Sequence, residues 1–140
     1  MKNLYLYLNS QDSIRLYNTN SPSECRIQLP KSYILEGSWS CALVDISLDC
    51  HFSPKSNRLY LCCDFVEDSY VKESLLPVLR NVEINNRYRK LKTELYTYPL
   101  YVPLKTSNLH TVRIYLLDET LQPVEFTTNQ LQCVLHLKKT

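Results

Sequence analysis

The sequence predicts an all-β protein: a single jelly roll in which about eight strands form two packed antiparallel sheets. Helix-forming residues are scarce, because Ala42 is the only alanine and alanine is the best helix former. Strand-forming residues are abundant, with eleven tyrosines beside many leucines, valines, isoleucines and threonines. Apolar and polar residues also alternate with a period of two in several segments, which is typical of strands with one buried face.

The length fits one jelly-roll domain that covers residues 1–140. A chain of 140 residues is near the commonest domain size and is long enough to bury a core. Its 44% of hydrophobic and 21% of charged residues are typical of a globular protein. Gly37 is the only glycine. This scarcity excludes Gly-rich phosphate-binding loops, which need several glycines at fixed spacing.

The first half of the chain contains four expected strands, at residues 3–8, 24–29, 39–48 and 59–66. Leucines and tyrosines alternate along the first, so that its leucines face one way and Tyr5 and Tyr7 the other. Pro30 is expected to end the second strand, because proline cannot donate to a ladder. The expected core row of the third strand is Ala42, Val44, Ile46 and Leu48. Polar loops at residues 9–13, 18–23 and 49–58 separate these strands.

The second half is expected to complete the sandwich. Residues 67–74 are polar and are expected to hold at most a helical turn, since Pro77 prevents a long helix. Further strands are predicted at residues 78–84, 111–117 and 131–137, with an extended tyrosine-rich segment at 93–104 and loops at 85–90 and 118–129. Hairpin turns such as Asn-Gly are missing, which favours a sandwich with crossing connections over a simple meander.

The charge pattern indicates no dedicated polyanion partner and no sequence-specific nucleic-acid binding. The net charge is only +2. One dense basic run, residues 87–90 with Lys92, is expected to be a solvated turn, with contact to nucleic acid or an acidic neighbour as the alternative. The longest apolar run, residues 59–63, is too short to span a membrane. No signal-peptide pattern opens the chain, so synthesis in the cytosol is expected.

The six cysteines are expected to be buried, reduced and metal-free. They are Cys25, Cys41, Cys50, Cys62, Cys63 and Cys133. None forms the CxxC spacing of a zinc site, and adjacent cysteines in a strand point to opposite faces. A chain of this size with a good core needs no disulfide staples. We therefore expect neither a metal nor another cofactor.

Catalysis is not predicted, so the chain is interpreted as a non-enzyme. The three histidines, His51, His110 and His136, are scattered, and no serine lies in a nucleophile elbow. Two carboxylate pairs, Asp45 with Asp49 and Asp64 with Glu67, are expected to be solvated, with cation binding as the alternative. Trp39 is expected in the core or at a sheet edge, with ligand stacking as the alternative.

Motifs spread over nearly the whole chain resemble those of one family. They comprise a Ser/Asn-rich turn after a short strand (residues 5–13), an aromatic-x-x-Asn (17–20), a strand ending in Leu29-Pro30, and a Leu-x-Gly-x-Trp (35–39) before an apolar strand. Matching segments continue at residues 59–64, 76–80, 101–104, 112–119, 123–126 and 134–139. The pattern resembles the penton-type single jelly-roll minor capsid proteins of Polinton (Maverick) elements, adintoviruses and adomaviruses. Cys25 replaces a usual aromatic residue, and Leu121 a common glycine.

This resemblance implies a structural minor capsid (penton) protein that forms pentameric vertices of an icosahedral virion by self-association. The implied partners are four further copies in a homopentamer and a double jelly-roll major capsid protein, with a fibre or receptor as an additional partner. The implied location is the virion, after synthesis in the host cytosol and assembly in the host nucleus. The alternative is a jelly-roll binding module that recognises a carbohydrate or a protein.

Five tyrosines are the predicted subunit interface. Tyrosine is enriched at protein interfaces because it buries a large area while its hydroxyl stays hydrated. The first strand carries leucines on one face and tyrosines on the other, and such a strand suits a face covered by a neighbour. The alternative is that each tyrosine only covers the end of a sheet. The predicted interface residues are Tyr5, Tyr7, Tyr96, Tyr98 and Tyr101.

Overall fold

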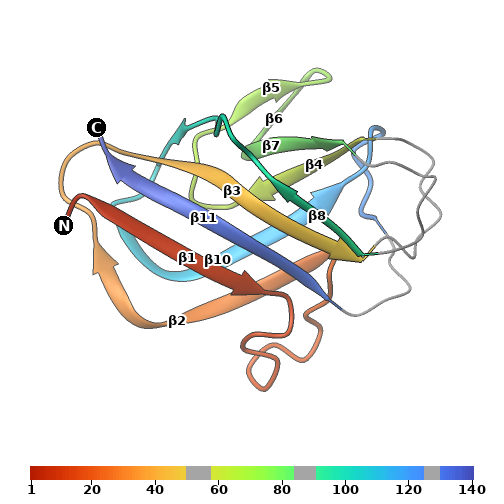
Figure 1. The fold of residues 1–140 in the computed structure, drawn as a ribbon, viewed down its shortest axis with the longest axis horizontal. Helices are drawn as coiled ribbons and strands as arrows, with labels where there is room; N and C mark the ends of the chain where they lie inside the picture. Colours follow the sequence, from red (N-terminus) through yellow and green to blue (C-terminus); the bar gives the residue numbers. More distant parts are fainter. Residues whose placement is uncertain (50–57, 84–90, 125–129) are drawn as a thin grey trace.

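The computed structural model describes residues 1–49, 58–83, 91–124 and 130–140, and these residues form eleven strands and no helix (Figure 1). The all-β prediction is confirmed. The strands are β1 (Asn3–Asn9), β2 (Glu24–Ile34), β3 (Trp39–Asp49), β4 (Arg58–Cys63), β5 (Ser69–Val71), β6 (Ser74–Leu76), β7 (Val78–Glu83), β8 (Leu91–Leu95), β9 (Val102–Pro103), β10 (Asn108–Leu117) and β11 (Leu131–Lys139).

Eight of these strands form a jelly roll. The first sheet has the order β1-β11-β3-β8, with β9 also pairing with β3, and the second has the order β2-β10-β4-β7. Neighbouring strands are antiparallel throughout. The chain crosses between the sheets after β1, β2 and β3, and its first and last strands lie side by side (Figure 1). Crossing connections of this kind define the predicted sandwich.

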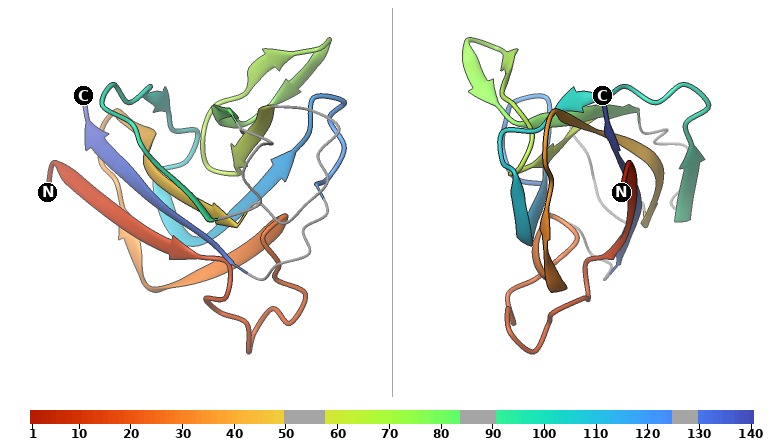
Figure 2. Two further views of the ribbon diagram at one scale, coloured as in Figure 1. Left: turned by 45° about the vertical axis from the view of Figure 1, so that its right-hand side comes forward. Right: turned by 90° about the vertical axis from the view of Figure 1, so that its left-hand side faces the viewer.

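The hydrophobic core lies between the two sheets, which face each other in Figure 2. Leu6 and Leu8 of β1 are buried there, and Leu4 packs against the same cluster. Tyr5 and Tyr7 point away from it and are exposed, so the predicted alternation of β1 is confirmed. Trp39 is buried in the core, and its indole Nε1 donates to the Glu36 carbonyl at 2.9 Å.

A β-bulge in β3 corrects the predicted core row of that strand. Val134 of β11 pairs with Asp45, but the next residue, Leu135, pairs with Leu43, so Val44 is an extra residue without a partner in the register. A bulge of this kind shifts the alternation by one residue. The core side chains are therefore Cys41 and Leu43 before the bulge and Ile46 and Leu48 after it, while Ala42 and Val44 do not join the core cluster.

Pro30 does not end its strand, because β2 continues to Ile34. The reason is its position. β2 is the edge strand of the second sheet, and the backbone N–H groups of Arg26 and Gln28 point away from β10 toward side chains of the preceding loop. Alternation places the nitrogen of Pro30 on that outer side as well, where the ladder loses no donor.

The expected helical turn at residues 67–74 is replaced by a two-stranded hairpin of β5 and β6. Lys72 and Glu73 form its turn with φ of 45° and 66°. Positive φ at both central residues is the geometry of a tight hairpin turn, here made without glycine. The Lys72 ammonium donates to the Glu119 carbonyl, which ties the turn to a neighbouring loop.

Several other boundaries differ from expectation. The strand expected at residues 59–66 ends at Cys63, and the extended segment 93–104 contains the end of β8 and the short β9. The expected loop at 85–90, most of that at 49–58 and part of that at 118–129 lie outside the described residues.

Candidate functional site

The outer face of the first sheet carries an aromatic cluster that we call the tyrosine face, formed by Tyr5, Tyr7, Tyr101 and His136. Register places Tyr5 of β1 directly opposite His136 of β11. Their rings stack with centroids 4.4 Å apart and planes 10° apart. Tyr101, just before β9, meets the same imidazole edge-on at 5.7 Å. Tyr5 is 51% exposed and Tyr7 76% exposed, so the face is open to contact.

Hydrogen bonds hold the imidazole of His136 at both ring nitrogens. Its Nε2 lies 2.8 Å from Oδ1 of Asn3, and its Nδ1 lies 2.8 Å from the Tyr101 hydroxyl. The amide oxygen only accepts, so Nε2 carries a proton, and in the neutral imidazole Nδ1 then accepts from the Tyr101 hydroxyl. Burial, and after it the charge of Lys138, lower the pKa of His136. The Lys138 ammonium lies 3.8 Å from the centroid of the Tyr101 ring.

Tyr96 and Tyr98 do not belong to the tyrosine face. Tyr96 is half-buried against the core, and the guanidinium of Arg80 lies 3.7 Å from its ring centroid. Burial, and then the charge of Glu94, raise the pKa of Tyr96 to about 12. Arg80 also donates to the Tyr98 carbonyl at 3.4 Å. These contacts hold β7 of the second sheet to the segment after β8, so Tyr96 joins the two sheets while the Tyr98 side chain is 84% exposed.

The β5–β6 hairpin, which we call the hairpin arm, forms a second exposed apolar surface. Tyr70 and Leu75 lie directly opposite each other and are 73% and 69% exposed. Figures 1 and 2 show the arm projecting from the sandwich, far from β1. Sequence reasoning missed this arm. Its signal was available: two short segments with apolar residues flank the polar pair Lys72 and Glu73.

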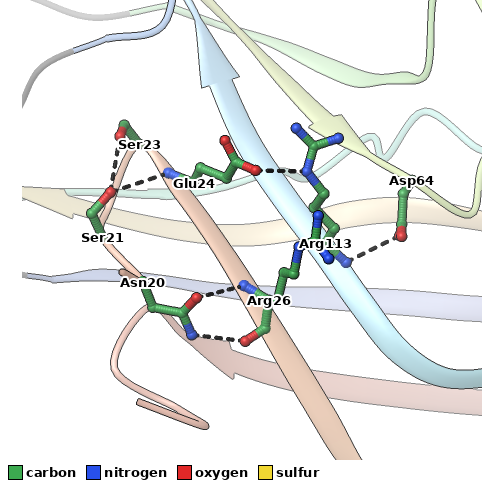
Figure 3. A network of polar contacts seen from close by, with 7 residues as sticks. All are labelled: Asn20, Ser21, Ser23, Glu24, Arg26, Asp64 and Arg113. Atoms are coloured by element: carbon green, nitrogen blue, oxygen red, sulfur yellow. Dashed lines mark hydrogen bonds and ion pairs between the residues drawn. The ribbon is translucent and has the colours of Figure 1, made fainter. Parts of the chain in front are cut away.

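A polar pocket lies beside the start of β2, with a volume of about 490 Å³. Asn20 donates to the Arg26 carbonyl at 2.7 Å and accepts from the Arg26 amide at 2.9 Å (Figure 3). The hydroxyls of Ser21 and Ser23 are 2.9 Å apart. The residues that line the pocket are Tyr17, Thr19, Asn20, Ser21, Ser23, Glu24 and Arg26. Several of its polar groups therefore bind one another across the loop and β2.

Arg113 connects this pocket to the neighbouring strands. Its Nε donates to the Glu24 carboxylate at 2.7 Å, and its backbone amide donates to Asp64 at 3.1 Å (Figure 3). Burial raises the pKa of Asp64, and the hydrogen bond from the Arg113 amide and the charge of Arg113 offset only part of this rise. Asp64 is thus half-buried and holds backbone rather than lying free in solvent as expected.

The other sequence candidates form no further site in the described chain. Asp45 lies on β3 opposite Val134 and is half-buried, whereas Glu67 is exposed. No group of three or more histidine, cysteine or acidic residues within the described ranges has the geometry of a metal site. No described helix is long and apolar enough to cross a membrane. The side chains of Asp49 and Lys92, and residues 87–90, His51 and Cys50, lie outside what the structure describes.

The five described cysteines are buried and free. Their expected burial is confirmed, and four of them, Cys25, Cys41, Cys63 and Cys133, belong to the core cluster. Burial raises the pKa of the Cys25 thiol to about 12 and that of Cys62 to about 11. These thiols therefore behave as small hydrophobic groups and not as nucleophiles.

No family model matches this chain, and a search of curated proteins finds no match. The features that bear on function are therefore the fold, its exposed surfaces and the sequence motifs. Among the surfaces described above, the tyrosine face and the hairpin arm are apolar, and the pocket beside β2 is polar.

Proposed function

We propose that this chain is a structural capsid protein that works by self-association, as the pentameric vertex (penton) subunit of an icosahedral virion. The single jelly roll and the sequence motifs support the virion role and a double jelly-roll major capsid protein as neighbour. The observation that carries self-association is the pair of separated apolar surfaces, the tyrosine face and the hairpin arm.

A closed ring requires two different contact patches on every subunit. Each subunit presents one patch to the neighbour on one side and the other patch to the neighbour on the opposite side. The tyrosine face and the hairpin arm meet this requirement, because β1 and the β5–β6 hairpin lie on different sides of the sandwich (Figure 1). Exposed tyrosines fit such contacts because their rings bury area while their hydroxyls stay hydrated.

The polar pocket beside β2 supports the alternative of a carbohydrate-binding module less well. A sugar site needs polar groups that are free to bind hydroxyls. Asn20 and Glu24 are already bound by Arg26 and Arg113 within the protein. A ligand would have to displace these internal hydrogen bonds, each of which contributes about 1 kcal/mol.

Native mass spectrometry of the purified protein tests the proposal. The wild type should form pentamers, and the double substitution Tyr5→Asp with Tyr7→Asp should abolish them. Two carboxylates buried without partners at each contact cost several kcal/mol by order of magnitude. The substitution Leu75→Asp in the hairpin arm should also reduce the pentamer population, because it places a charge at the second contact patch.

The matched control is the double substitution Ile14→Asp with Leu16→Asp. Both residues are exposed and apolar, but they lie in the loop after β1, outside both patches. This variant receives the same added charge and should keep its pentamers. A wild type that stays monomeric at high concentration with its capsid partner present would refute the proposal. Pentamers that survive the Tyr5 and Tyr7 substitutions would move the contact elsewhere.

A further inference from the structure

The loop at residues 10–23 connects β1 and β2, which are edge strands of different sheets. The outer edges of these two strands differ in how well they are protected. The outer edge of β2 is closed by that loop. Its backbone amides at Glu24, Arg26 and Gln28 donate to side-chain oxygens of Ser21, Asn20 and Ser13, respectively. Pro30 continues the same outer row without any N–H. Side-chain caps and proline are devices that prevent an edge strand from pairing with another chain.

The outer edge of β1 has no such protection in the described chain. β1 is the end of its sheet and pairs only with β11. Lys2 and Ser10 bond toward β11, so by alternation the backbone groups of Asn3, Tyr5, Tyr7 and Asn9 face outward. The outward backbone groups of Asn9 are already hydrogen-bonded, because its amide donates to the Asp12 carboxylate and its carbonyl accepts from the Asp12 amide. Asn3, Tyr5 and Tyr7 remain as three outward backbone positions.

The strand is otherwise well suited to pairing. Its register with β11 runs without a break from Asn3 to Asn9. Residues 3–9 contain no proline and no charged side chain, the features that usually blunt an exposed edge.

We propose that the β1 edge pairs antiparallel with β1 of a second copy of this chain, around a twofold axis at Tyr5. In this register Tyr5 lies opposite Tyr5 of the second copy, and Asn3 lies opposite its Tyr7. The outward backbone N–H and C=O groups of Asn3, Tyr5 and Tyr7 thereby bond those of the second copy. Asn9, which is already bonded to Asp12, stays outside the ladder. The two first sheets join into one continuous sheet.

Charge complementarity favours a second copy as the occupant. Antiparallel pairing in this register sets Lys2 opposite Leu8 of the second copy, next to its Asn9. The carboxylate of Asp12 lies there, 3.1 Å from the Asn9 amide. Lys2 and Asp12 are both exposed, so each end of the paired strands brings an ammonium beside a carboxylate. The symmetric contact makes this attraction twice.

This pairing goes beyond the proposed ring. A twofold contact joins two copies and cannot by itself close five. It uses the backbone edge of β1 and leaves the rings of Tyr5 and Tyr7 on the outer face. Its direct product is a dimer, or two rings linked through their edges.

Cysteine cross-linking tests the register. Directly opposed, hydrogen-bonded residues of antiparallel strands have Cα atoms about 5.5 Å apart, within the range that a disulfide bridges. In a Cys50→Ser background, Tyr5→Cys should give a disulfide-linked dimer on a non-reducing gel after mild oxidation. Tyr7→Cys is the matched control. Two residues 7 would be four positions apart along the paired strands, roughly 14 Å, too far to link.

A charge substitution tests the same pairing without cysteine. Lys2→Glu should raise the dimer dissociation constant measured by sedimentation equilibrium. Lys31→Glu is its control, because the same charge is reversed at an exposed lysine of β2, in the other sheet and away from the β1 edge. Absence of a Tyr5→Cys dimer, equal cross-linking of Tyr7→Cys, or equal weakening by the two lysine substitutions would overturn the proposal. If the protein forms pentamers but Tyr5→Cys gives no disulfide-linked dimer, only the edge pairing is refuted. If Tyr5→Cys gives the dimer but no pentamers form, only the proposed ring is refuted.

Discussion

The hydroxyl of Tyr101 lies 2.8 Å from Nδ1 of His136, and the ring of Tyr5 stacks on the same imidazole. In the neutral imidazole Nδ1 accepts from this hydroxyl. Protonation of Nδ1 would reverse the hydrogen bond, because the hydroxyl oxygen can also accept, and would place a second positive charge near the Lys138 ammonium. Burial and Lys138 lower the pKa of His136 in the folded protein accordingly.

Stability should therefore fall as the pH falls below neutrality. Above the ordinary histidine pKa of about 6.5, His136 is neutral in both the folded and the unfolded chain, and its full contribution is present. As the pH drops from there through the lower folded pKa, the unfolded chain binds the proton first, so the free energy of unfolding decreases. Urea titrations at several pH values between 7.5 and 5 measure this slope.

His136→Gln should reduce the slope, because glutamine does not titrate. His110→Gln, which removes an exposed histidine of β10, is the matched control. The account is wrong if the wild type and His136→Gln lose stability in parallel over this range.

The Arg80 guanidinium above the Tyr96 ring gives a second prediction. Arg80→Met keeps most of the aliphatic stem but removes the charge over the ring and the hydrogen bond to the Tyr98 carbonyl. The free energy of unfolding should fall by about 1 kcal/mol, the usual size of a partly exposed cation–π contact. Tyr96→Phe keeps the ring and should stay closer to the wild type. Urea unfolding of the three proteins checks the order, and a larger loss in Tyr96→Phe would contradict it.

Much of this sandwich follows from short-range pattern. The period of two in β1 correctly separates Leu6 and Leu8 from Tyr5 and Tyr7, since one buried face is enough to specify it. The bulge at Val44 is different. The row from Ala42 to Leu48 alternates without a flaw, and only its pairing with β11 reveals the extra residue.

The candidate site was less predictable than the fold. Tyr5 and His136 come from opposite ends of the chain and meet through strand register, which spacing in the sequence does not reveal. Tyr96 looked like a surface residue of a tyrosine-rich segment, but Arg80 of another sheet covers it. Pro30 shows the same limit, because its effect depends on whether its strand lies at an edge.

Thiol labelling gives a third prediction. Burial raises the pKa of each described cysteine, so little thiolate is present near neutral pH and each side chain is shielded from reagent. In the native protein at most one thiol, Cys50, should react quickly with iodoacetamide. In 8 M urea without reductant all six should react, and mass spectrometry counts the adducts. Rapid native labelling of Cys25 or Cys62 would contradict the buried assignment.

The last prediction concerns Asn20, whose amide caps the edge of β2. It makes two hydrogen bonds to the Arg26 backbone and donates to the Asp12 carbonyl at 3.0 Å. Asn20→Ala removes all three and exposes the outward backbone of Arg26. Each such bond contributes about 1 kcal/mol net, and water replaces part of it, so we expect a loss of about 1–3 kcal/mol in the free energy of unfolding.

An uncapped β2 edge should also pair with other chains. Light scattering of Asn20→Ala should therefore rise faster than that of the wild type at equal concentration, even where both remain folded. Asn20→Asp keeps an acceptor for the Arg26 amide but loses both donated bonds, so it should fall between the two. Asn18→Ala, an exposed asparagine of the same loop, controls for the change in composition. If Asn18→Ala aggregates as fast as Asn20→Ala, loss of the cap is not the cause.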